Sequence, residues 1–306
     1  MHDLGAMVFF SVIASMSAAL SQPPSGLNEF SRLSGRGGAL ATIRRDAAAA
    51  LGRALDDGVD LLEIEFPPLL ETKTQFDDFS NVEVLDANRD FGVQLAIEPE
   101  VRRAAGDSGL WLCFADEGEA DLAREAWPGA RYGESYQTYI TAAVRAVGQE
   151  PLVPMGSGAL DMANKLGSFF GANGPPASPP PPAPPATLQM IIQPGDGGPM
   201  EDWLNLERLK QQDVPMICVN GALDKVTSGY YSNFLNPELG KSSDRFFSRF
   251  ESCYYLKPLG SGRGWLFRVY SEPWQLFRLT REDIELLETY DTRPSAQKCV
   301  DRLKQP

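Results

Sequence analysis

Histidine is almost absent from this chain of 306 residues. Its single copy, His2, lies at the amino terminus. With no imidazole in the rest of the chain, a Ser-His-Asp or Cys-His hydrolase is excluded, and so is a zinc or non-haem iron site built from histidines. Any chemistry must therefore use carboxylates, lysine, tyrosine or the backbone.

Cysteine is also scarce. The four cysteines, Cys113, Cys218, Cys253 and Cys299, are far apart, and no CxxC pair occurs. This spacing excludes a zinc knuckle and a dithiol redox motif. Cys113 and Cys218 lie in apolar runs of strand length, where thiols are usually inert parts of a core. We therefore expect no metal site and no cofactor.

Basic residues are outnumbered by acidic ones. The chain has 28 Lys and Arg against 41 Asp and Glu, a formal net charge of −13 and a pI near 4.6. Such a surface repels polyanions, so we expect no nucleic-acid partner. Hydrophobic residues make up 43% of the chain and aromatic residues 10%, which is ordinary for a globular protein and excludes wholesale disorder.

The N-terminal apolar run, residues 6–20, is too short to cross a bilayer comfortably. It resembles the hydrophobic part of a signal peptide, although no Lys or Arg precedes it. Residues 21–45 are rich in Ser and Arg and contain one acid, Glu29, which is the composition of a transit peptide. Residues 1–44 are therefore expected to form a bipartite plastid-targeting leader, as in a secondary-plastid alga, or a flexible N-terminal segment. The alternative is a frayed helix that packs on the domain.

Apolar runs alternate with amphipathic segments along the body of the chain. Runs that are hydrophobic almost throughout and separated by helices indicate strands buried on both faces of a parallel sheet. Near the C-terminus, aromatic-rich runs around a Gly-rich turn indicate a hairpin. The sequence predicts an α/β fold with a three-layer Rossmann-like sheet, a mostly parallel core and a C-terminal antiparallel hairpin extension. The expected strands are residues 59–66, 92–97, 110–115, 188–192, 214–219, 252–256, 265–270 and 274–279, and the expected helices are residues 45–57, 117–127 and 200–211.

Residues 171–187 (GANGPPASPPPPAPPAT) interrupt this pattern with eight prolines and no large apolar side chain. Such a segment is expected to be an exposed polyproline tether, or a ligand for a proline-binding module. Because it falls between a strand-helix unit and the next strand, it is expected to be an insertion within one α/β domain over residues 45–290. Residues 291–306 are expected to be a C-terminal tail.

Two carboxylates, Glu63 and Glu65, alternate with apolar residues in the first expected strand. Both should therefore lie on one face of the sheet, about 7 Å apart. A carboxylate pair can bind Mg²⁺ or share a proton. The alternative is structural, because a buried carboxylate needs a partner such as an arginine or a helix N-terminus.

Residues 244–281 reverse the charge of the chain, with seven Lys and Arg against three acids among ten aromatic residues. Arginine with aromatics is typical of protein-interface hot spots and of single-stranded RNA platforms. A protein partner is favoured over RNA because the rest of the chain is acidic. The alternative is that the aromatics point into the core and the arginines into solvent. Arg263, Arg268 and Trp274 are the candidates for partner binding in this stretch.

Several separated motifs occur along the same chain. They are DGVDLLEIEFP (residues 57–67), NGALDK (220–225), SGYY (228–231), CYYL (253–256), WLFRVY (265–270) and PW (273–274). Together they resemble the plastid family of the low photosystem II accumulation proteins. That family shares its domain of unknown function with the tail of a chloroplast adenylate kinase.

The resemblance implies a protein of the plastid stroma or of the stromal face of the thylakoid, linked to photosystem assembly or accumulation, with no established catalytic residues. Residues 220–231 follow an expected buried strand, so they should lie at the carboxyl end of the sheet, where open α/β folds bind ligands. The matched positions of interest are Glu65 and Pro67 in the first motif, and Asn220, Gly221, Asp224, Ser228, Gly229 and Tyr230 in the second.

These observations predict a non-enzymatic chloroplast protein that binds photosystem subunits or other thylakoid proteins through its sheet edge and its arginine and aromatic residues. We expect no transmembrane helix in the mature chain and allow peripheral membrane association. A permanent subunit of a light-harvesting supercomplex would differ from such a protein only in how long it stays bound. The rival is a stromal enzyme that binds a nucleotide or phosphometabolite, with Mg²⁺ on Glu63 and Glu65 and the ligand on residues 220–231.

Overall fold

The computed structural model describes residues 36–68, 82–107, 109–127, 138–143, 183–194, 201–228, 236–260, 263–280 and 284–305. The helices in this part are α3 (Arg36–Asp56), α4 (Val82–Leu95), α5 (Pro99–Ala105), α6 (Glu117–Ala126), α9 (Glu201–Leu209), α10 (Leu223–Thr227), α11 (Pro237–Arg245), the 3-10 helix η2 (Phe247–Arg249) and α12 (Ala296–Lys304). The strands are β1 (Leu61–Glu65), β2 (Leu110–Phe114), β3 (Thr138–Ala142), β4 (Leu188–Ile192), β5 (Met216–Val219), β6 (Glu251–Leu259), β7 (Gly264–Val269), β8 (Trp274–Leu279) and β9 (Ile284–Tyr290).

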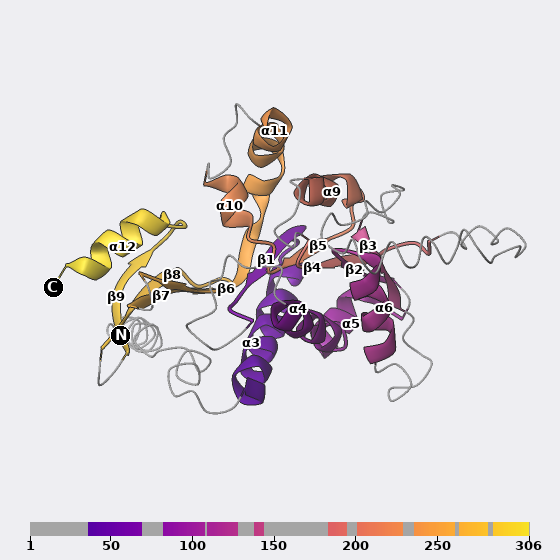
Figure 1. Cartoon of the computed structure of the whole chain (residues 1–306), viewed down its shortest axis with the longest axis horizontal. Coiled ribbons are helices and arrows are strands. Elements are labelled where there is room, and N and C mark those ends of the chain that lie inside the picture. Colours follow the sequence, from indigo (N-terminus) through magenta and orange to yellow (C-terminus); the bar gives the residue numbers. More distant parts are fainter. Residues whose placement is uncertain are drawn as a thin grey trace, which may run out of the picture.

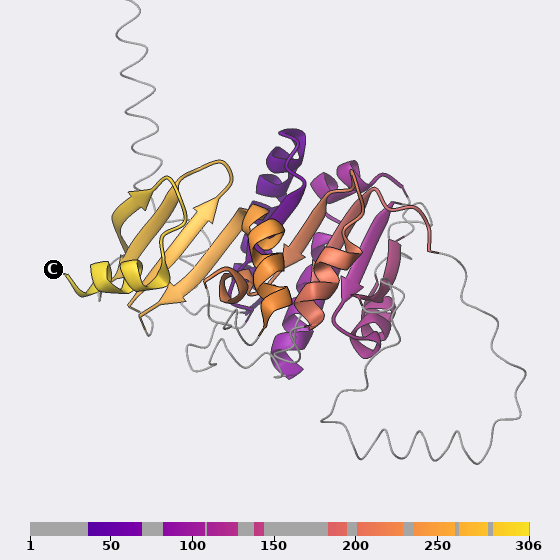
Figure 2. The same cartoon turned by 90° about the horizontal axis from the view of Figure 1, so that it is seen from above.

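All of the described strands belong to one sheet, in the order β3-β2-β4-β5-β1-β6-β7-β8-β9. The strands from β3 to β6 are parallel. From β6 to β9 each neighbour is antiparallel. Figures 1 and 2 show the sheet running from β2 and β3 at one end to β8 and β9 at the other. The expected α/β fold, with a parallel core and an antiparallel C-terminal extension, is confirmed.

Helices cover both faces of the sheet (Figure 1). α3, α4, α5 and α6 lie on one face, and α9, α10 and α11 lie on the other. Strands β2, β4 and β5 are buried along their whole length, since both of their faces meet helices. This is why their sequences are continuous apolar runs rather than alternating ones.

Strand β1 divides its side chains between the two layers. Leu62 and Ile64 pack in the core beneath α3, whereas Leu61 packs with residues of β5, α9 and α10 on the opposite face. Because side chains alternate along a strand, Glu63 and Glu65 share the face of Leu61. That face is also the side of α10 and α12.

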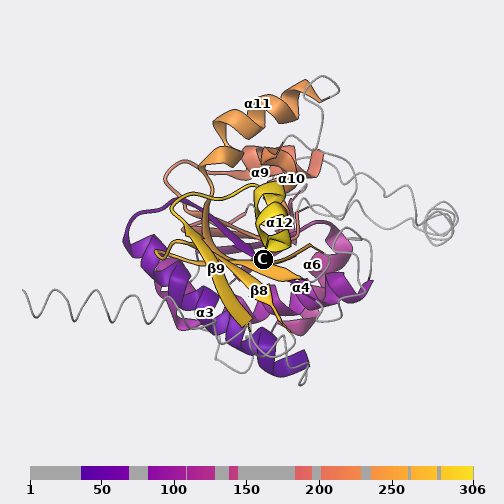
Figure 3. The ribbon, with the colours of Figure 1, turned by 90° about the vertical axis from the view of Figure 1, so that its left-hand side faces the viewer.

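The C-terminal residues, expected to be a tail at residues 291–306, contain helix α12. Ser295 caps α12 by accepting a hydrogen bond from the backbone N–H of Lys298. Cys299 and Leu303, one helical turn apart, are buried against Trp274 and other residues of β6 to β9. Figure 3 shows α12 on the side of the sheet that faces α9 to α11. Only Ala296, Cys299, Val300 and Leu303 are apolar in this short segment, which is a weak helix signal, so the sequence pattern did not reveal the helix.

Helix α3 begins at Arg36, and Ile43 is buried in the core, so residues 36–44 form a helix that packs on the domain, which is the alternative to a leader at these positions. One expectation at an element boundary is wrong. The expected strand at residues 92–97 is instead the end of α4 and the turn that follows it. Its alternating apolar residues belong to the helix face that packs on the sheet, where a Cβ at Gly92 would overlap the side chain of Ile192.

Residues 1–35 and most of the proline-rich segment lie outside the described residues. The end of that segment, residues 183–187, runs beside β2, where the carbonyl of Pro184 accepts a hydrogen bond of 2.9 Å from Nε1 of Trp111. Among the described helices, none combines the length and the apolar character that a bilayer span requires.

Candidate functional site

The carboxyl ends of β5 and β1 lie side by side, next to the middle of β6, since the three strands are parallel neighbours. Glu65 is the last residue of β1 and pairs with Tyr255 in the β1–β6 register. Asn220 follows β5 directly, and α10 begins three residues later. This arrangement brings ionisable side chains from β1, α10 and β6 together on one face of the sheet.

Glu63 is the most deeply buried acid of this group, with 1% of its side chain exposed. Its Oε2 accepts hydrogen bonds from Oγ of Ser252 at 2.6 Å and from Nη1 of Arg293 at 3.1 Å. The Arg293 guanidinium also lies 4.4 Å from the ring centroid of Tyr255. A buried carboxylate is therefore balanced by a cation that is itself held by an aromatic ring.

A second ion pair joins α10 to β6. Nζ of Lys257 lies 2.6 Å from Oδ2 of Asp224. Burial acts to raise the pKa of Asp224, but the attraction and the hydrogen bond of Lys257 outweigh it, and the pKa is lowered. For Lys257, burial acts to lower the pKa, but Tyr255, Asp224 and Glu65 outweigh it and the pKa is raised. Both groups stay charged at neutral pH.

Glu65 lies between these two ion pairs and is half-buried. Its Oε2 accepts a hydrogen bond of 3.3 Å from the backbone N–H of Ala222. Burial raises the pKa of Glu65 to about 8. Lys257 and Arg293 act against that shift, whereas Asp224 and Glu63 add to it. The raised pKa favours the neutral carboxylic acid form of Glu65 beside these two charge pairs.

Glu63, Glu65, Asp224, Lys257 and Arg293 together form an ionic cluster. Next to this ionic cluster, three buried amide side chains connect the strand ends to α4 by hydrogen bonds. Nδ2 of Asn220 donates to Oδ1 of Asn88 at 2.6 Å, and Oδ1 of Asn220 accepts from the backbone N–H of Phe66 at 2.8 Å. Nδ2 of Asn88 in turn donates to Oε1 of Gln193, at the end of β4. Asn220 and Gln193 both have left-handed backbone conformations, with φ of 49° and 42°. The network fixes the ends of β1, β4 and β5 relative to one another.

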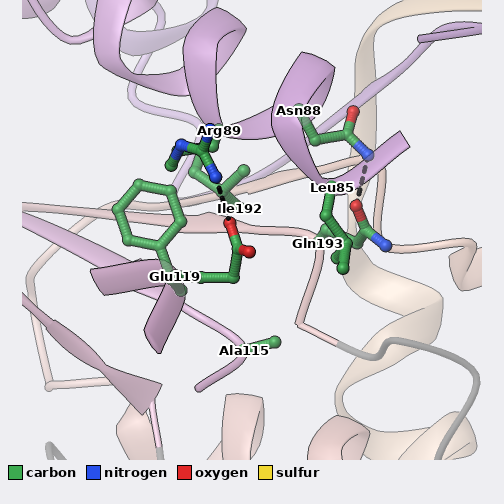
Figure 4. Close-up of a pocket in the computed structure, with 8 residues that line it drawn as sticks. Leu85, Asn88, Arg89, Ala115, Glu119, Ile192 and Gln193 are labelled. Carbon is green, nitrogen blue, oxygen red and sulfur yellow. Dashed lines mark hydrogen bonds and ion pairs between the residues drawn. The ribbon is translucent and has the colours of Figure 1, made fainter. Parts of the chain in front are cut away.

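Strands β2 and β4 mark the position where α/β sheets usually bind ligands. After β2 the chain passes through α6 on one face, and after β4 it passes through α9 on the other, which makes a topological switch point. The small pocket there is crossed by an ion pair of 3.0 Å between Nη1 of Arg89 and Oε2 of Glu119 (Figure 4). Its volume of about 10 Å³ has room for one water molecule.

The structure brings five of the residues singled out from sequence to the ionic cluster or beside it: Glu63, Glu65, Asn220, Gly221 and Asp224. Gly221 contributes through its backbone and by close packing. Its carbonyl oxygen accepts a hydrogen bond of 2.9 Å from Nε1 of Trp203. A Cβ at Gly221 would overlap Sγ of Cys218.

The remaining residues of the second motif lie away from the cluster. Ser228 is exposed at the end of α10, where its backbone N–H donates to the carbonyl of Asp224. Gly229 and Tyr230 lie outside the described residues.

The arginine and aromatic residues expected to form an exposed docking face have a different arrangement. Trp274 is 3% exposed, and the guanidinium groups of Arg268 and Arg293 lie 5.4 and 5.3 Å from its ring centroid. Arg268 also pairs with Glu251 at 2.5 Å. Arg263 is exposed in the turn between β6 and β7 and is not part of this stack. Most of the aromatic rings of this stretch are buried and therefore stabilise the fold from inside, whereas Phe250 and Tyr270 are partly exposed.

Sequence reasoning missed Arg293, Asn88 and Gln193. Arg293 lies in the loop after β9, and its contact with β1 joins residues 230 positions apart, which no local pattern indicates. The two amides occur in ordinary polar positions of α4 and of the turn after β4. In the described segments, no group of three or more His, Cys, Asp or Glu side chains is arranged to hold a metal ion.

Comparison with known proteins gives a family and no more. Searches of curated proteins and of solved structures each found no significant match. A protein-family model described as a domain of unknown function (DUF1995) matches residues 39–301, from the first turns of α3 to the last turns of α12. That span includes every described strand and every residue of the ionic cluster. The chain therefore belongs to the DUF1995 family.

Proposed function

We propose that this protein is a non-enzymatic plastid protein that supports photosystem assembly or accumulation by contacting thylakoid proteins. The motifs that resemble the low photosystem II accumulation proteins support this proposal, because they fall on neighbouring elements. The first lies on β1, the second runs from the end of β5 into α10, and the last three lie on β6, β7 and β8. Residues 21–35, which precede α3, contain four Ser and a single acid, and this composition supports the plastid location.

The observation that favours protein contacts is the edge strand β9. It pairs with β8 on one side and ends the sheet of the described residues. Its sequence, IELLETY, contains neither Pro nor Lys, the residues with which proteins often protect such an edge. An open edge of seven residues can accept an extended segment of a partner as a further strand.

The charge at this edge indicates what kind of segment would bind. Glu285 is exposed. Glu288 forms an ion pair of 3.3 Å with Arg302 of α12. The whole chain is strongly acidic. A partner segment with basic side chains is therefore favoured, and acidic segments are disfavoured.

The contacts of the ionic cluster argue against the rival Mg²⁺ enzyme. Glu63 already binds Arg293 and Ser252. Lys257 is neutralised by Asp224. A metal ion would have to displace a buried guanidinium from Glu63, and a phosphate would have to displace a carboxylate from Lys257.

The test is co-purification of the tagged full-length protein from solubilised thylakoids. Wild type should recover photosystem subunits. Thr289→Lys, at an exposed position of β9, should lose them because a lysine blocks strand addition. Leu122→Lys is the matched control, since Leu122 is 44% exposed on α6 at the other end of the sheet.

Two results would overturn the proposal. One is recovery of the wild type as a free monomer without photosystem subunits, and the other is full co-purification by Thr289→Lys. Thermal-shift measurements with nucleotides and Mg²⁺ distinguish the rival. A saturable stabilisation that Glu65→Gln abolishes would favour the enzyme.

A further inference from the structure

The described end of the proline-rich segment contacts two aromatic side chains of the sheet. Trp111 of β2 and Tyr139 of β3 are partners in the β2–β3 register, and their ring centroids lie 5.2 Å apart with an interplanar angle of 55°. Nε1 of Trp111 donates a hydrogen bond of 2.9 Å to the carbonyl oxygen of Pro184. Ala186 belongs to the same buried cluster as Trp111. An indole N–H and a pair of aromatic rings therefore meet a backbone built from prolines.

The covalent structure of this backbone restricts its shape. The rings of Pro184 and Pro185 hold φ at about −65°, and each proline biases the residue before it toward the extended or polyproline II conformation. Pro185 therefore helps to set the direction of the Pro184 carbonyl, the group that Trp111 binds. A preformed polyproline backbone loses little conformational entropy on binding, and proline-recognition modules bind it in aromatic-lined grooves.

The start of β4 anchors the segment next to Trp111. The backbone N–H groups of Thr187 and Leu188 donate to the carbonyl of Gly109 at 2.8 and 3.1 Å. The hydroxyl of Thr187 donates to the carbonyl of Ala105 at 2.5 Å, and a Cβ at Gly109 would overlap that hydroxyl. Only two residues separate this anchor from Pro184. The tethered segment therefore has a large advantage in effective concentration over any free segment.

The segment carries no charge. Residues 171–187 contain no Asp, Glu, Lys or Arg, in a chain of net charge −13. The acidic surface therefore neither attracts nor repels this segment, and its binding must depend on backbone shape, hydrogen bonding and apolar contact. Trp111 provides the hydrogen bond and, with Tyr139, the apolar contact.

We propose that Trp111 and Tyr139 form a proline-recognition site and that the end of this chain's own proline-rich segment is its occupant. While the segment is bound, the site is closed to proline-rich segments of other proteins. The site lies on β2 and β3, at the end of the described sheet opposite to β9. It is therefore separate from the edge proposed above for partner binding, and it does not depend on that proposal.

The test follows the indole N–H of Trp111 in the full-length protein by NMR. The chain has five tryptophans, and the Trp111 signal is the one that is missing from Trp111→Phe. The probe is a synthetic peptide of residues 179–187, PPPPAPPAT. In the double variant Pro184→Gly with Pro185→Gly, flexible glycines weaken the internal contact, so the peptide should shift the Trp111 signal in a saturable way. Wild type should bind the peptide at least about tenfold more weakly, because its own segment competes.

Two controls separate proline recognition from ordinary packing. Nε1 of Trp203 donates a hydrogen bond of 2.9 Å to the carbonyl of Gly221, away from β2 and β3, so Trp203 is matched to Trp111 in its bond but not in its place. Calorimetry of the double glycine variant should show that adding Trp111→Phe abolishes peptide binding and that adding Trp203→Phe preserves it. A peptide with serine at every proline position should not bind.

Three results would overturn the proposal. They are no saturable binding by the double glycine variant up to about 1 mM peptide, equal binding of the serine peptide, and equal affinity of wild type and double variant for the proline peptide. The last result would show that the chain's own segment does not close the site. If the double variant does not fold, Pro185→Gly alone decides by the same three criteria, because it frees the residue whose carbonyl Trp111 binds.

Discussion

Nη1 of Arg293 lies 3.1 Å from Oε2 of Glu63, a residue 230 positions earlier whose side chain is 1% exposed. The same guanidinium lies over the rings of Tyr255 and Trp274, at 4.4 and 5.3 Å from their centroids. One side chain from the loop before α12 thus contacts β1, β6 and β8. It connects the antiparallel extension to the parallel core.

Arg293→Met should therefore destabilise the protein by about 3 kcal/mol, because it leaves the Glu63 carboxylate buried without its cation. Denaturant unfolding followed by circular dichroism measures this loss. The double variant Glu63→Gln with Arg293→Met should recover part of it, since an amide costs less to bury than an unpaired charge.

Arg245→Met provides the matched control. Arg245 pairs with Glu207 at 2.5 Å on the surface, so its removal should change stability little. An equal loss in the two arginine variants would contradict the special role of Arg293.

Glu65→Gln should change how stability depends on pH. The pKa of Glu65 is about 8 in the folded protein and 4.5 in an ordinary glutamate. Between these values the folded state binds a proton that the unfolded state has lost, so wild-type stability falls as pH rises from 4.5 to 8 and this contribution levels off above 8. Glutamine does not titrate and should remove the slope.

The expected result is a variant similar to wild type near pH 4.5 and more stable by up to about 5 kcal/mol at pH 9, since one pKa unit corresponds to about 1.4 kcal/mol. Urea unfolding at pH 5, 7 and 9 measures the difference. Parallel pH profiles for the two proteins would show that Glu65 has an ordinary pKa.

Asn220→Ala should cost about 3 kcal/mol. It removes the acceptor of the Phe66 N–H and the donor to Asn88, and it places alanine at a φ of 49°. Asn220→Gly separates the two effects, because glycine adopts this conformation without strain but still lacks the hydrogen bonds. We expect thermal unfolding to give the order wild type, then glycine, then alanine. Equal stability of the glycine and alanine variants would contradict a contribution from backbone strain.

Gly264→Ala tests how α12 packs on the sheet. A Cβ at Gly264 would overlap the carbonyl oxygen of Phe277 and the side chain of Leu303. We expect a loss of about 2 kcal/mol and faster hydrogen exchange in residues 296–304.

Gly118→Ala, within α6, is the control for Gly264→Ala. Its Cβ would have the Asp116 carboxylate as nearest neighbour, at 3.3 Å, and alanine favours a helix over glycine by about 1 kcal/mol. Normal protection of α12 in Gly264→Ala would show that the helix does not depend on this close approach.

Sequence patterns predicted several elements correctly. They failed where a helix and a strand can show the same short apolar pattern. The apolar runs at residues 188–192 and 274–279 coincide with β4 and β8. The run at residues 92–97 alternates like a strand but belongs to the end of α4, because a helix face against a sheet can show the same short pattern. The alternation of Glu63 and Glu65 with apolar residues predicted that both lie on one face of the sheet. The arginine partner expected for a buried carboxylate is Arg293.

The sequence by itself determined the α/β class and the parallel core, because buried parallel strands leave local signatures. Only the tertiary structure decided that β1 lies between β5 and β6, and that Arg293 reaches Glu63. Strand order and ion pairs depend on distances between segments far apart in the chain, and periodicity along the chain carries no information about those distances. For the same reason the raised pKa of Glu65 follows from its neighbours in space rather than from its neighbours in sequence.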